Sequence, residues 1–387
     1  MTDLADVVDL GAGQVTGTPR GYLNTAAEGL PLVGADQAME RYLTIKDRGS
    51  QGRGELDAIR DQTAALVGAT IGVDAADVAF VASTSRGLDI ALQSVDWQPG
   101  DNIVFGDTEF PTIAFASTLL AQRGIRPRVV PSRNGVLDPA DYVAQIDDRT
   151  RLVVVSLASY RTGQLLDPAT ICDAAHQHGA LVFGDAVQAV GGVQVEAGDL
   201  DYLCAGTFKW LGGVHGVALF YANPQTTAGG RPPYAAYRGV VDLFAPDRLQ
   251  RVDLHPGARR FEEGMPNYLA ISVLHSSLSR LRDIGIPRIQ QHNRVLAARL
   301  IDGLRAQGIR PVGPTDLQQR SSIVSFRTSQ ETAIGTALAD RGTTVWARDG
   351  SVRLSAHLYT TAADIDDALT QLDQLRVQGL SVADTQP

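Results

Sequence analysis

Short apolar segments alternate with segments of helical length between about Val78 and Ala222. The apolar segments carry hydrophobic residues at nearly every position, which is typical of strands that are buried on both faces. Short strands with helices between them indicate a mostly parallel sheet that is covered on both sides. The expected strands are Val78–Ala82, Asn102–Phe105, Pro127–Val130, Leu152–Leu157, Leu181–Gly184, Tyr202–Ala205 and Val217–Tyr221. Helices are expected at Leu88–Val95, Thr112–Arg123 and Ala169–His178.

The second part of the chain has a different pattern. A segment rich in proline, glycine and arginine, residues 225–264, is expected to run over the surface. Beyond it we expect helices at Tyr268–Arg282, Ile286–Gln307, Glu331–Arg341 and Ala362–Leu375, and strands at Ser322–Phe326, Thr343–Ala347 and Val352–Ser355. The sequence therefore predicts a large α/β domain, residues 20–266, and a smaller α+β domain of residues 267–387 together with the segment 1–19.

Composition narrows the class of function. The 387 residues carry a net charge of −9, which argues against a nucleic-acid-binding face. The two cysteines, Cys172 and Cys204, give no disulfide framework and fit a reducing cytoplasm. The N-terminus has no apolar core of a signal peptide, and the longest apolar runs are too short to span a bilayer. We expect a cytoplasmic protein that binds neither nucleic acid nor membrane.

Lysine is rare in this chain. Of the 34 lysines and arginines, only Lys46 and Lys209 are lysines. Lys209 lies between an expected strand and a glycine turn, whereas Lys46 lies on a polar helix. Arginine stays protonated, but a lysine in an apolar site can lose its proton and form a Schiff base. The choice of lysine at position 209 therefore suggests a chemical role, and the alternative is that arginine-rich codon usage leaves a few lysines by chance.

Hydroxyl groups gather at an expected strand-to-helix transition, in Ala82-Ser-Thr-Ser-Arg-Gly-Leu88. Free backbone N–H groups and the helix dipole make such a helix start an anion site. Thr84 and Ser85 would hold a phosphate there. The alternative is plain N-capping by serine and threonine.

A carboxylate ends another apolar strand, at Asp185. Ligands of open α/β sheets bind at the carboxyl ends of strands, where a carboxylate can pair with a protonated pyridine nitrogen. Gln188 could reach the ring hydroxyl, and Thr207, two residues before Lys209, could add a phosphate contact. A helix N-cap is the alternative for Asp185. Taken together and in this order, these motifs predict a pyridoxal 5′-phosphate site with Lys209 bound to the aldehyde.

The chain is similar over nearly its whole length to the class V aminotransferase family. This is the branch of fold type I that includes cysteine desulfurases, kynureninase and isopenicillin N epimerase. The resemblance implies a seven-stranded large domain with a smaller C-terminal α+β domain. It also implies a homodimer in which each active site is built from two subunits.

The family's motifs can be followed residue by residue. Tyr22–Ala27 resembles the N-terminal segment on the substrate side, which suggests Asn24 as a substrate contact. Glu109–Thr112 resembles the place where a ring stacks on the pyridine, which suggests Phe110. Tyr160–Gln164 looks like the loop below the cofactor, and Tyr160 would contact the substrate. Arg260–Asn267 resembles the segment that reaches the neighbouring subunit's phosphate, with Asn267 as the contact. Val352–Tyr359 matches the strand whose arginine, Arg353 here, grips the substrate carboxylate.

The resemblance leaves several reactions open. Lys209, freed by the incoming amino acid, would be the general base, and loss of the α-hydrogen leads to β-elimination, transamination or epimerisation. Decarboxylation or deamination is a further alternative. A cysteine desulfurase is not expected, because no cysteine follows Cys204, and Phe208 stands where desulfurases have a histidine. We favour β-elimination from an S-substituted cysteine, because it requires only Lys209 and a leaving group. His357 could donate a proton, although packing behind the arginine strand explains it better.

Other classes of protein fit the sequence less well. His176 and His178 are two residues apart on an expected helix, so they point in different directions and make a poor metal pair. No metal site is expected. Gly11-Ala-Gly13 lacks the third glycine and the preceding strand of a dinucleotide fingerprint. A cofactor-binding sensor or an inactive scaffold remains the non-enzymatic alternative.

Overall fold

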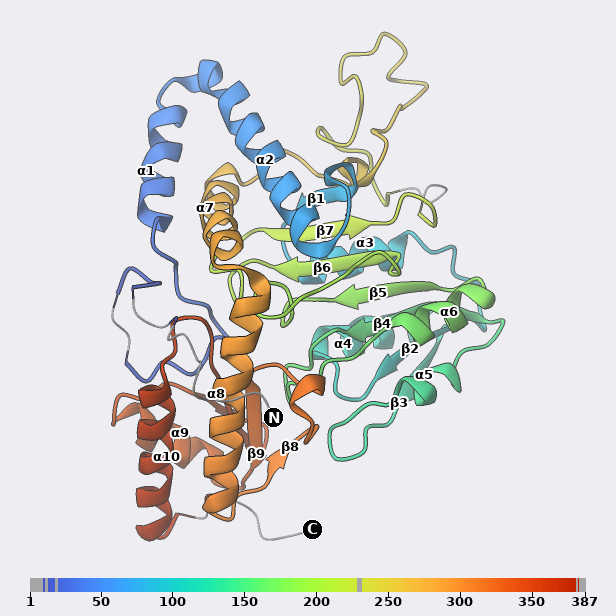
Figure 1. The fold of residues 1–387 in the computed structure, drawn as a ribbon. Helices are drawn as coiled ribbons and strands as arrows, with labels where there is room; N and C mark the ends of the chain where they lie inside the picture. Colours follow the sequence, from blue (N-terminus) through green and yellow to red (C-terminus); the bar gives the residue numbers. More distant parts are fainter. Residues whose placement is uncertain (1–9, 11–12, 18–19, 228–231, 381, 383–387) are drawn as a thin grey trace.

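The computed structural model describes all residues except 1–9, 11–12, 18–19, 228–231, 381 and 383–387. Its centre is a seven-stranded sheet with the order β1-β7-β6-β5-β4-β2-β3 (Figure 1). The strands are β1 Val78–Val81, β2 Asn102–Gly106, β3 Arg126–Val130, β4 Thr150–Ser156, β5 Leu181–Asp185, β6 Tyr202–Gly206 and β7 Ala218–Ala222. All neighbouring pairs from β6 to β3 are parallel, whereas β7 is antiparallel to both β1 and β6. The mostly parallel sheet predicted from the sequence is confirmed.

Helices cover both faces of this sheet, because its central strands are buried on both sides. One core lies between the sheet and α3 and α4, and contains Ile90, Ile113 and Phe183. The other lies between the sheet and α2, α5, α6 and α7, and contains Val67 and Ile171. These helices are α2 Arg53–Ile71, α3 Thr84–Gln93, α4 Pro111–Ala121, α5 Pro139–Val143, α6 Ala169–Gln177 and α7 Tyr268–Ile284.

A smaller domain follows along the chain. Its antiparallel sheet has the order β10-β11-β9-β8 and packs against helices around a separate core. The strands are β8 Pro311–Val312, β9 Ile323–Arg327, β10 Trp346–Arg348 and β11 Ser351–Ser355, and the helices are α8 Ile286–Ala306, α9 Glu331–Ala339 and α10 Ala362–Val377. Strand β10 begins three residues later than expected. The backbone of Thr344 is bonded instead to the N-terminal segment, through Gly21 and Leu23.

The short helix α5 was not expected from the sequence, and neither were the two helices α1 Ala35–Lys46 and α2. Helix α7 packs against both of them, and its buried side chains belong to the core of the large domain. We therefore propose that the domain boundary lies near Gly285, between α7 and α8, rather than at residue 266. Most of the segment 1–19, which the sequence assigns to the small domain, lies outside the described residues.

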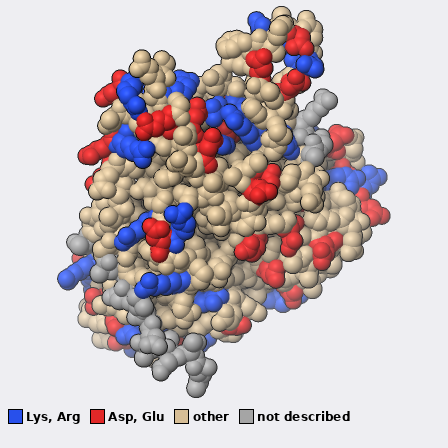
Figure 2. All heavy atoms as spheres, turned by 45° about the horizontal axis from the view of Figure 1, so that its top comes forward, with Lys and Arg blue, Asp and Glu red and all other residues tan. Residues whose placement is uncertain are grey.

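The segment between β7 and α7 projects from the large domain (Figure 1). Its tip carries apolar side chains in the open, with Phe244 78% and Leu249 87% exposed. On the face drawn in Figure 2, acidic and basic side chains are interspersed rather than gathered into one basic patch. Among the described residues, no helix is both long and apolar enough to cross a bilayer.

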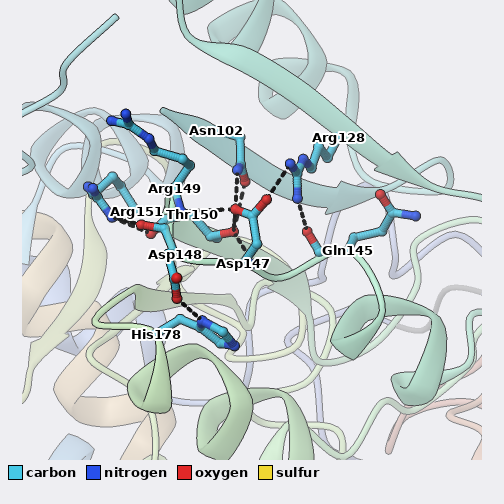
Figure 3. A network of polar contacts seen from close by, with 9 residues as sticks. All are labelled: Asn102, Arg128, Gln145, Asp147, Asp148, Arg149, Thr150, Arg151 and His178. Carbon is cyan, nitrogen blue, oxygen red and sulfur yellow. Dashed lines mark hydrogen bonds and ion pairs between the residues drawn. The ribbon is translucent and has the colours of Figure 1, made fainter. Parts of the chain in front are cut away.

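Polar contacts fix the amino ends of three sheet strands (Figure 3). Asp147 accepts hydrogen bonds from Asn102 of β2 at 2.9 Å and from Arg128 of β3 at 2.6 Å. The hydroxyl of Thr150, on β4, donates to the Asn102 side chain at 2.9 Å. These contacts connect β2, β3 and β4 where the strands begin. They leave the opposite side of the sheet, where the strands have their carboxyl ends, open to a binding site.

Candidate active site

A pocket of about 220 Å³ opens at the carboxyl ends of β4, β5 and β6. Strands β5 and β6 are parallel and lie side by side, so their carboxyl ends meet at this edge (Figure 1). The starts of α3 and α4 close the pocket on one side, and the turn after β6 closes it on the other. Its lining comprises Ser83, Thr84, Ser85, Leu88, Phe110, Thr112, Ile113, Ser156, Ala158, Tyr160, Phe183, Asp185, Val187, Gln188, Phe208 and Lys209. Most of the accessible surface of the lining is apolar, which strengthens the interaction between the few charges in it.

Lys209 lies in the turn that follows β6 and is 9% exposed. Burial lowers the pKa of Lys209 from 10.5 to about 8, while the Asp185 carboxylate opposes this shift. The ammonium lies 5.5 Å from the ring centre of Phe208 and 5.9 Å from that of Phe110. A lysine with a pKa near neutrality can lose its proton readily, as a nucleophile or general base must.

Asp185 is the last residue of β5 and is buried. One of its oxygens accepts a hydrogen bond of 3.0 Å from the amide of Val187. Burial raises the pKa of Asp185, the Val187 amide lowers it, and Lys209 lowers it further. Asp185 is the one carboxylate among the residues that line the pocket. Its second oxygen is therefore available to a cationic group of a ligand.

The start of α3 forms one end of the pocket. Ser83 caps the helix by accepting a hydrogen bond from the Arg86 amide, while Thr84 accepts one from the Gly206 amide at 2.9 Å. The Thr84 hydroxyl keeps its own proton for a ligand. Gly87 allows this helix to lie against the sheet, because a Cβ there would lie 2.5 Å from the sulfur of Cys204. The hydroxyls and helix N–H groups expected to bind a phosphate are therefore brought together.

Two of the expected cofactor contacts do not reach this pocket. The hydroxyl of Thr207 is fully buried and donates to the main-chain carbonyl of Val214 or Val217. Its single proton is thus used within the turn, and the phosphate contact expected of Thr207 stays a prediction. Asn267 caps α7 and donates to the Gly216 carbonyl at 3.4 Å. It lines a separate hollow of about 140 Å³, so a role toward a neighbouring subunit stays a prediction.

Gln188 lines the pocket, but both ends of its amide have partners. Its nitrogen donates to the Ala26 carbonyl at 2.9 Å, and its oxygen accepts from the indole of Trp210 at 2.8 Å. One N–H of the amide therefore remains for a ligand. The sequence analysis did not identify Trp210, which follows Lys209 directly and fixes the orientation of Gln188.

Arg353 lies on β11 and is only 3% exposed. It donates to the main-chain carbonyl of Tyr160 at 2.8 Å and lies 4.9 Å from the ring centre of Trp346. Its buried Nε has no hydrogen-bond partner among the described residues. Burial lowers the pKa of Arg353 to about 10. A buried guanidinium without a carboxylate partner is costly, so this group is poised for an anionic ligand.

The remaining predicted residues lie around these groups. Tyr160 lines the pocket, and its ring meets that of Phe110 edge to face, with centres 5.4 Å apart. The side-chain oxygen of Asn24 is buried and has no hydrogen-bond partner within the described chain. His357 is fully buried against the Trp210 carbonyl, and burial lowers its pKa to about 3. It is therefore a neutral packing residue, as the sequence favours.

Glu109 and Ser156 were not assigned a role from the sequence. Ser156 ends β4 and lines the pocket, and the side chain of Glu109 is buried against it. Burial raises the pKa of Glu109 to about 7. The described residues contain no group of three or more histidine, cysteine, aspartate or glutamate side chains that could hold a metal ion.

One protein family and several known proteins resemble this chain in sequence. The profile of the family described as Aminotransferase class-V matches residues 36–368. An uncharacterized aminotransferase of Schizosaccharomyces pombe is 30% identical over 79% of this chain and 79% of its own length. A cysteine desulfurase of Dickeya dadantii is 29% identical over 81% of this chain and 77% of its own length.

Solved structures share the fold. A cysteine desulfurase from Thermococcus onnurineus has a TM-score of 0.84 and 24% identity, covering 93% of this chain and 95% of that one. The cystine C–S lyase C-DES has a TM-score of 0.84 and 22% identity, covering 92% and 97%. These likenesses confirm the fold type that the sequence predicts.

Proposed function

The chain belongs to the class V aminotransferase family of pyridoxal phosphate-dependent enzymes, and we propose that it catalyses β-elimination from an S-substituted cysteine. The proposal rests on one observation: Lys209 and Asp185 line the same pocket, whose accessible surface is mostly apolar. The products would be a thiol, ammonia and pyruvate. An aminotransferase or epimerase of the same family is the alternative, and so is a decarboxylating or deaminating variant.

The residues present fit the cofactor. The start of α3, with Thr84 and Ser85, would take the phosphate, and the free oxygen of Asp185 would take the ring nitrogen. Phe110 would lie against the ring face, and Gln188 has one N–H left for the ring hydroxyl. When bound, the cofactor supplies an electron sink for charge that develops at the substrate's α-carbon. The protein's part is to bind, to orient and to move protons.

Lys209 would move the proton. Its lowered pKa of about 8 leaves a substantial fraction of the amine neutral near pH 7.5. The neutral amine of Lys209 would hold the cofactor through its aldehyde, and the same amine would act as the general base for the substrate's α-hydrogen. The rings of Phe208 and Phe110 lie beside the amine and contribute to the burial that lowers its pKa.

Arg353 would bind the substrate carboxylate. Its Nε, which has no hydrogen-bond partner in the described part of the chain, is a charge-assisted donor, and a planar guanidinium suits a carboxylate with two parallel bonds. With its carboxylate held by Arg353, the substrate would present its α-hydrogen to Lys209. Asn24, whose side-chain oxygen has no partner among the residues that the structure describes, and Tyr160 would contact the same substrate.

Elimination is favoured over sulfur transfer by the cysteines of this chain. Desulfurases of the family need a nucleophilic cysteine on a mobile loop, but Cys172 and Cys204 are both buried. Burial raises the pKa of Cys172 to about 12 and that of Cys204 well above its usual value. Neither forms a reactive thiolate near neutral pH. Both are free thiols, which supports the proposed cytoplasmic location.

A homodimer with shared active sites is part of the proposal. The segment that ends at Asn267 has an exposed side chain in Met265, 48% accessible, beside a hollow at the edge of the large domain. The projecting segment adds Phe244 and Leu249, whose exposure is unusual for apolar side chains of this size. A second subunit would cover these surfaces.

The test is an absorption spectrum of the protein reconstituted with pyridoxal phosphate, before and after addition of S-methylcysteine or another S-substituted cysteine. We expect a visible band from the lysine-bound cofactor, absent in Lys209→Ala, that returns after turnover while pyruvate accumulates. Conversion to the pyridoxamine form without pyruvate would make the protein an aminotransferase. Absence of the visible band would overturn the assignment of the site. A band that supports no turnover of any amino acid would favour a sensor.

A further inference from the structure

The side chain of Glu109 is buried directly behind the pocket. It is 8% exposed, and its partners are all neutral. Its Oε1 accepts a 2.9 Å hydrogen bond from the Ser156 amide and a 3.4 Å one from the Tyr142 hydroxyl. Its Oε2 is hydrogen-bonded to the Ser156 hydroxyl. Within the described part of the chain no ion pair compensates this carboxyl.

This arrangement lies beside Asp185. Ser156 and Asp185 are partners in register on the parallel strands β4 and β5, so their side chains point to the same face of the sheet. An ionised Glu109 would place a second buried negative charge next to Asp185. Two like charges in a low-dielectric site repel strongly, so one of them takes up a proton.

The next residue, Phe110, connects Glu109 to the pocket. Glu109 precedes it directly, and Phe110 caps α4 with its ring against the pocket. The bonds from Glu109 to Ser156 therefore tie the start of α4 to the end of β4. We propose that Glu109 is a positioning residue that acts in its neutral form. It donates to the Ser156 hydroxyl and accepts from the Ser156 amide, and these two bonds hold Phe110 at the pocket. Because Glu109 is neutral, Asp185 is the only anion among the residues that line the pocket.

The charged and titratable groups around Glu109 agree with this role. Tyr142 approaches it from α5, Tyr160 from the loop after β4, and Asp185 from β5. The cations near this set are Lys209, which faces Asp185 on the pocket side, and Arg161 and Arg353, which lie near Tyr160. Burial together with the Asp185 charge raises the pKa of Glu109 to about 7, so the neutral form is populated near neutral pH.

The test depends on a difference between two variants. Glutamine reproduces the hydrogen-bonding pattern of the protonated acid, since its oxygen accepts and its nitrogen donates, whereas alanine removes both bonds. Because the inference rests on the proposed cofactor site, each protein is first reconstituted with pyridoxal phosphate, and its dissociation constant and visible circular dichroism are measured from pH 6 to 8.5. Glu40→Gln, on the exposed surface of α1, is the matched control.

We expect Glu109→Gln to bind the cofactor within twofold of the wild type at pH 6, and Glu109→Ala at least tenfold more weakly with a reduced dichroic band. The wild type should change its dichroic band as the pH rises through 7 to 8, and Glu109→Gln should not. Equal weakening of the two variants would show that the negative charge is needed, and equal binding by all of them would show that Glu109 positions nothing. Either result overturns the inference while leaving the cofactor site intact.

Two further controls keep the outcome clear. If Glu109→Ala does not fold, Ser156→Ala removes the same hydroxyl bond from the other side and must weaken binding in Glu109→Gln and in the wild type alike. A wild-type protein without a visible band would overturn the proposed function and this inference together.

Discussion

Arg353 and Tyr160 join the two domains across the active site. The guanidinium on β11 donates a 2.8 Å hydrogen bond to the carbonyl of Tyr160, which belongs to the loop after β4. The group expected to bind the substrate carboxylate thus also fixes the backbone of a residue that lines the pocket. If Arg353 binds the substrate carboxylate as proposed, binding would be coupled to the backbone position of Tyr160 through this one side chain.

We expect Arg353→Lys to lower kcat/KM for an amino-acid substrate by about 10- to 100-fold, because a charge-assisted pair of bonds contributes about 1.5–3 kcal/mol. The loss should appear mainly in KM, and steady-state kinetics would measure it. Arg348→Lys, at a neighbouring exposed position, is the control and should change little. Equal losses in both variants would contradict the assignment of Arg353.

Lys209 is expected to be the residue that binds the cofactor. The chain has only one other lysine, Lys46, at the exposed end of α1. Reduction of the loaded protein with borohydride should therefore attach the cofactor to the peptide that contains Lys209, as read by mass spectrometry. Lys209→Arg should abolish the visible band, and Lys46→Arg should retain it. Label on Lys46 in the native protein would exclude the proposed site.

Cofactor attachment to the apoprotein should depend on pH. Only the neutral amine of Lys209 attacks the aldehyde, and its pKa is lowered from 10.5 to about 8. The second-order rate constant should rise about tenfold per pH unit below 8 and level off above it. Asp185→Asn removes a carboxylate that raises the pKa of Lys209, so its midpoint should move to lower pH. Stopped-flow absorbance measures both profiles, and a midpoint near 10 would contradict a buried amine.

The positions of Asp185 and Lys209 could be predicted from the sequence, because both follow short strands that are apolar throughout. The rule that ligands bind at the carboxyl ends of such strands then places them together. Helix α1 was missed because its pattern is weakly amphipathic: Met39 and Leu43, four residues apart, are both exposed. Periodicity indicates a helix only when its apolar face is buried.

Other features depend on contacts between distant residues. The hydroxyl of Thr207 turns toward Val214 and Val217, which a local motif does not reveal. The burial of Glu109 depends on Tyr142 and Ser156, 33 and 47 residues further along the chain. The sequence showed which residue types were present, but the tertiary fold determined which of them face the pocket.

The stability of the apoprotein should report on Glu109. Its pKa rises from 4.5 to about 7 on folding, so between these values the folded protein binds the proton more tightly than the unfolded chain. The contribution of this group to the free energy of unfolding is therefore fully present below pH 4.5 and is lost as the pH rises through 7. Glu109→Gln lacks this dependence.

Urea unfolding of the wild type and of Glu109→Gln should diverge accordingly. Between pH 5 and pH 8 the wild type should lose up to about 3 kcal/mol relative to the variant, since each pKa unit corresponds to about 1.4 kcal/mol. Glu40→Gln provides the exposed reference. Parallel curves for the wild type and Glu109→Gln would mean that Glu109 titrates like an exposed carboxyl.

Gly29 supports the backbone of Lys209, and its replacement should displace this lysine, which we propose to be catalytic. The Gly29 amide donates to the Phe208 carbonyl at 2.8 Å, and a Cβ at Gly29 would lie 1.8 Å from the Lys209 carbonyl oxygen. Because the Lys209 carbonyl oxygen is part of the backbone, it cannot move aside alone, and the turn after β6 must shift. Gly29→Ala should therefore lower kcat and weaken the visible band by at least tenfold, and should destabilise the fold by about 1–3 kcal/mol.

In Gly54→Ala, the matched control on α2, the new methyl meets no atom within 4 Å, and the helix should gain about 0.5–1 kcal/mol. Full activity in Gly29→Ala would show that the turn can move without displacing the Lys209 amine.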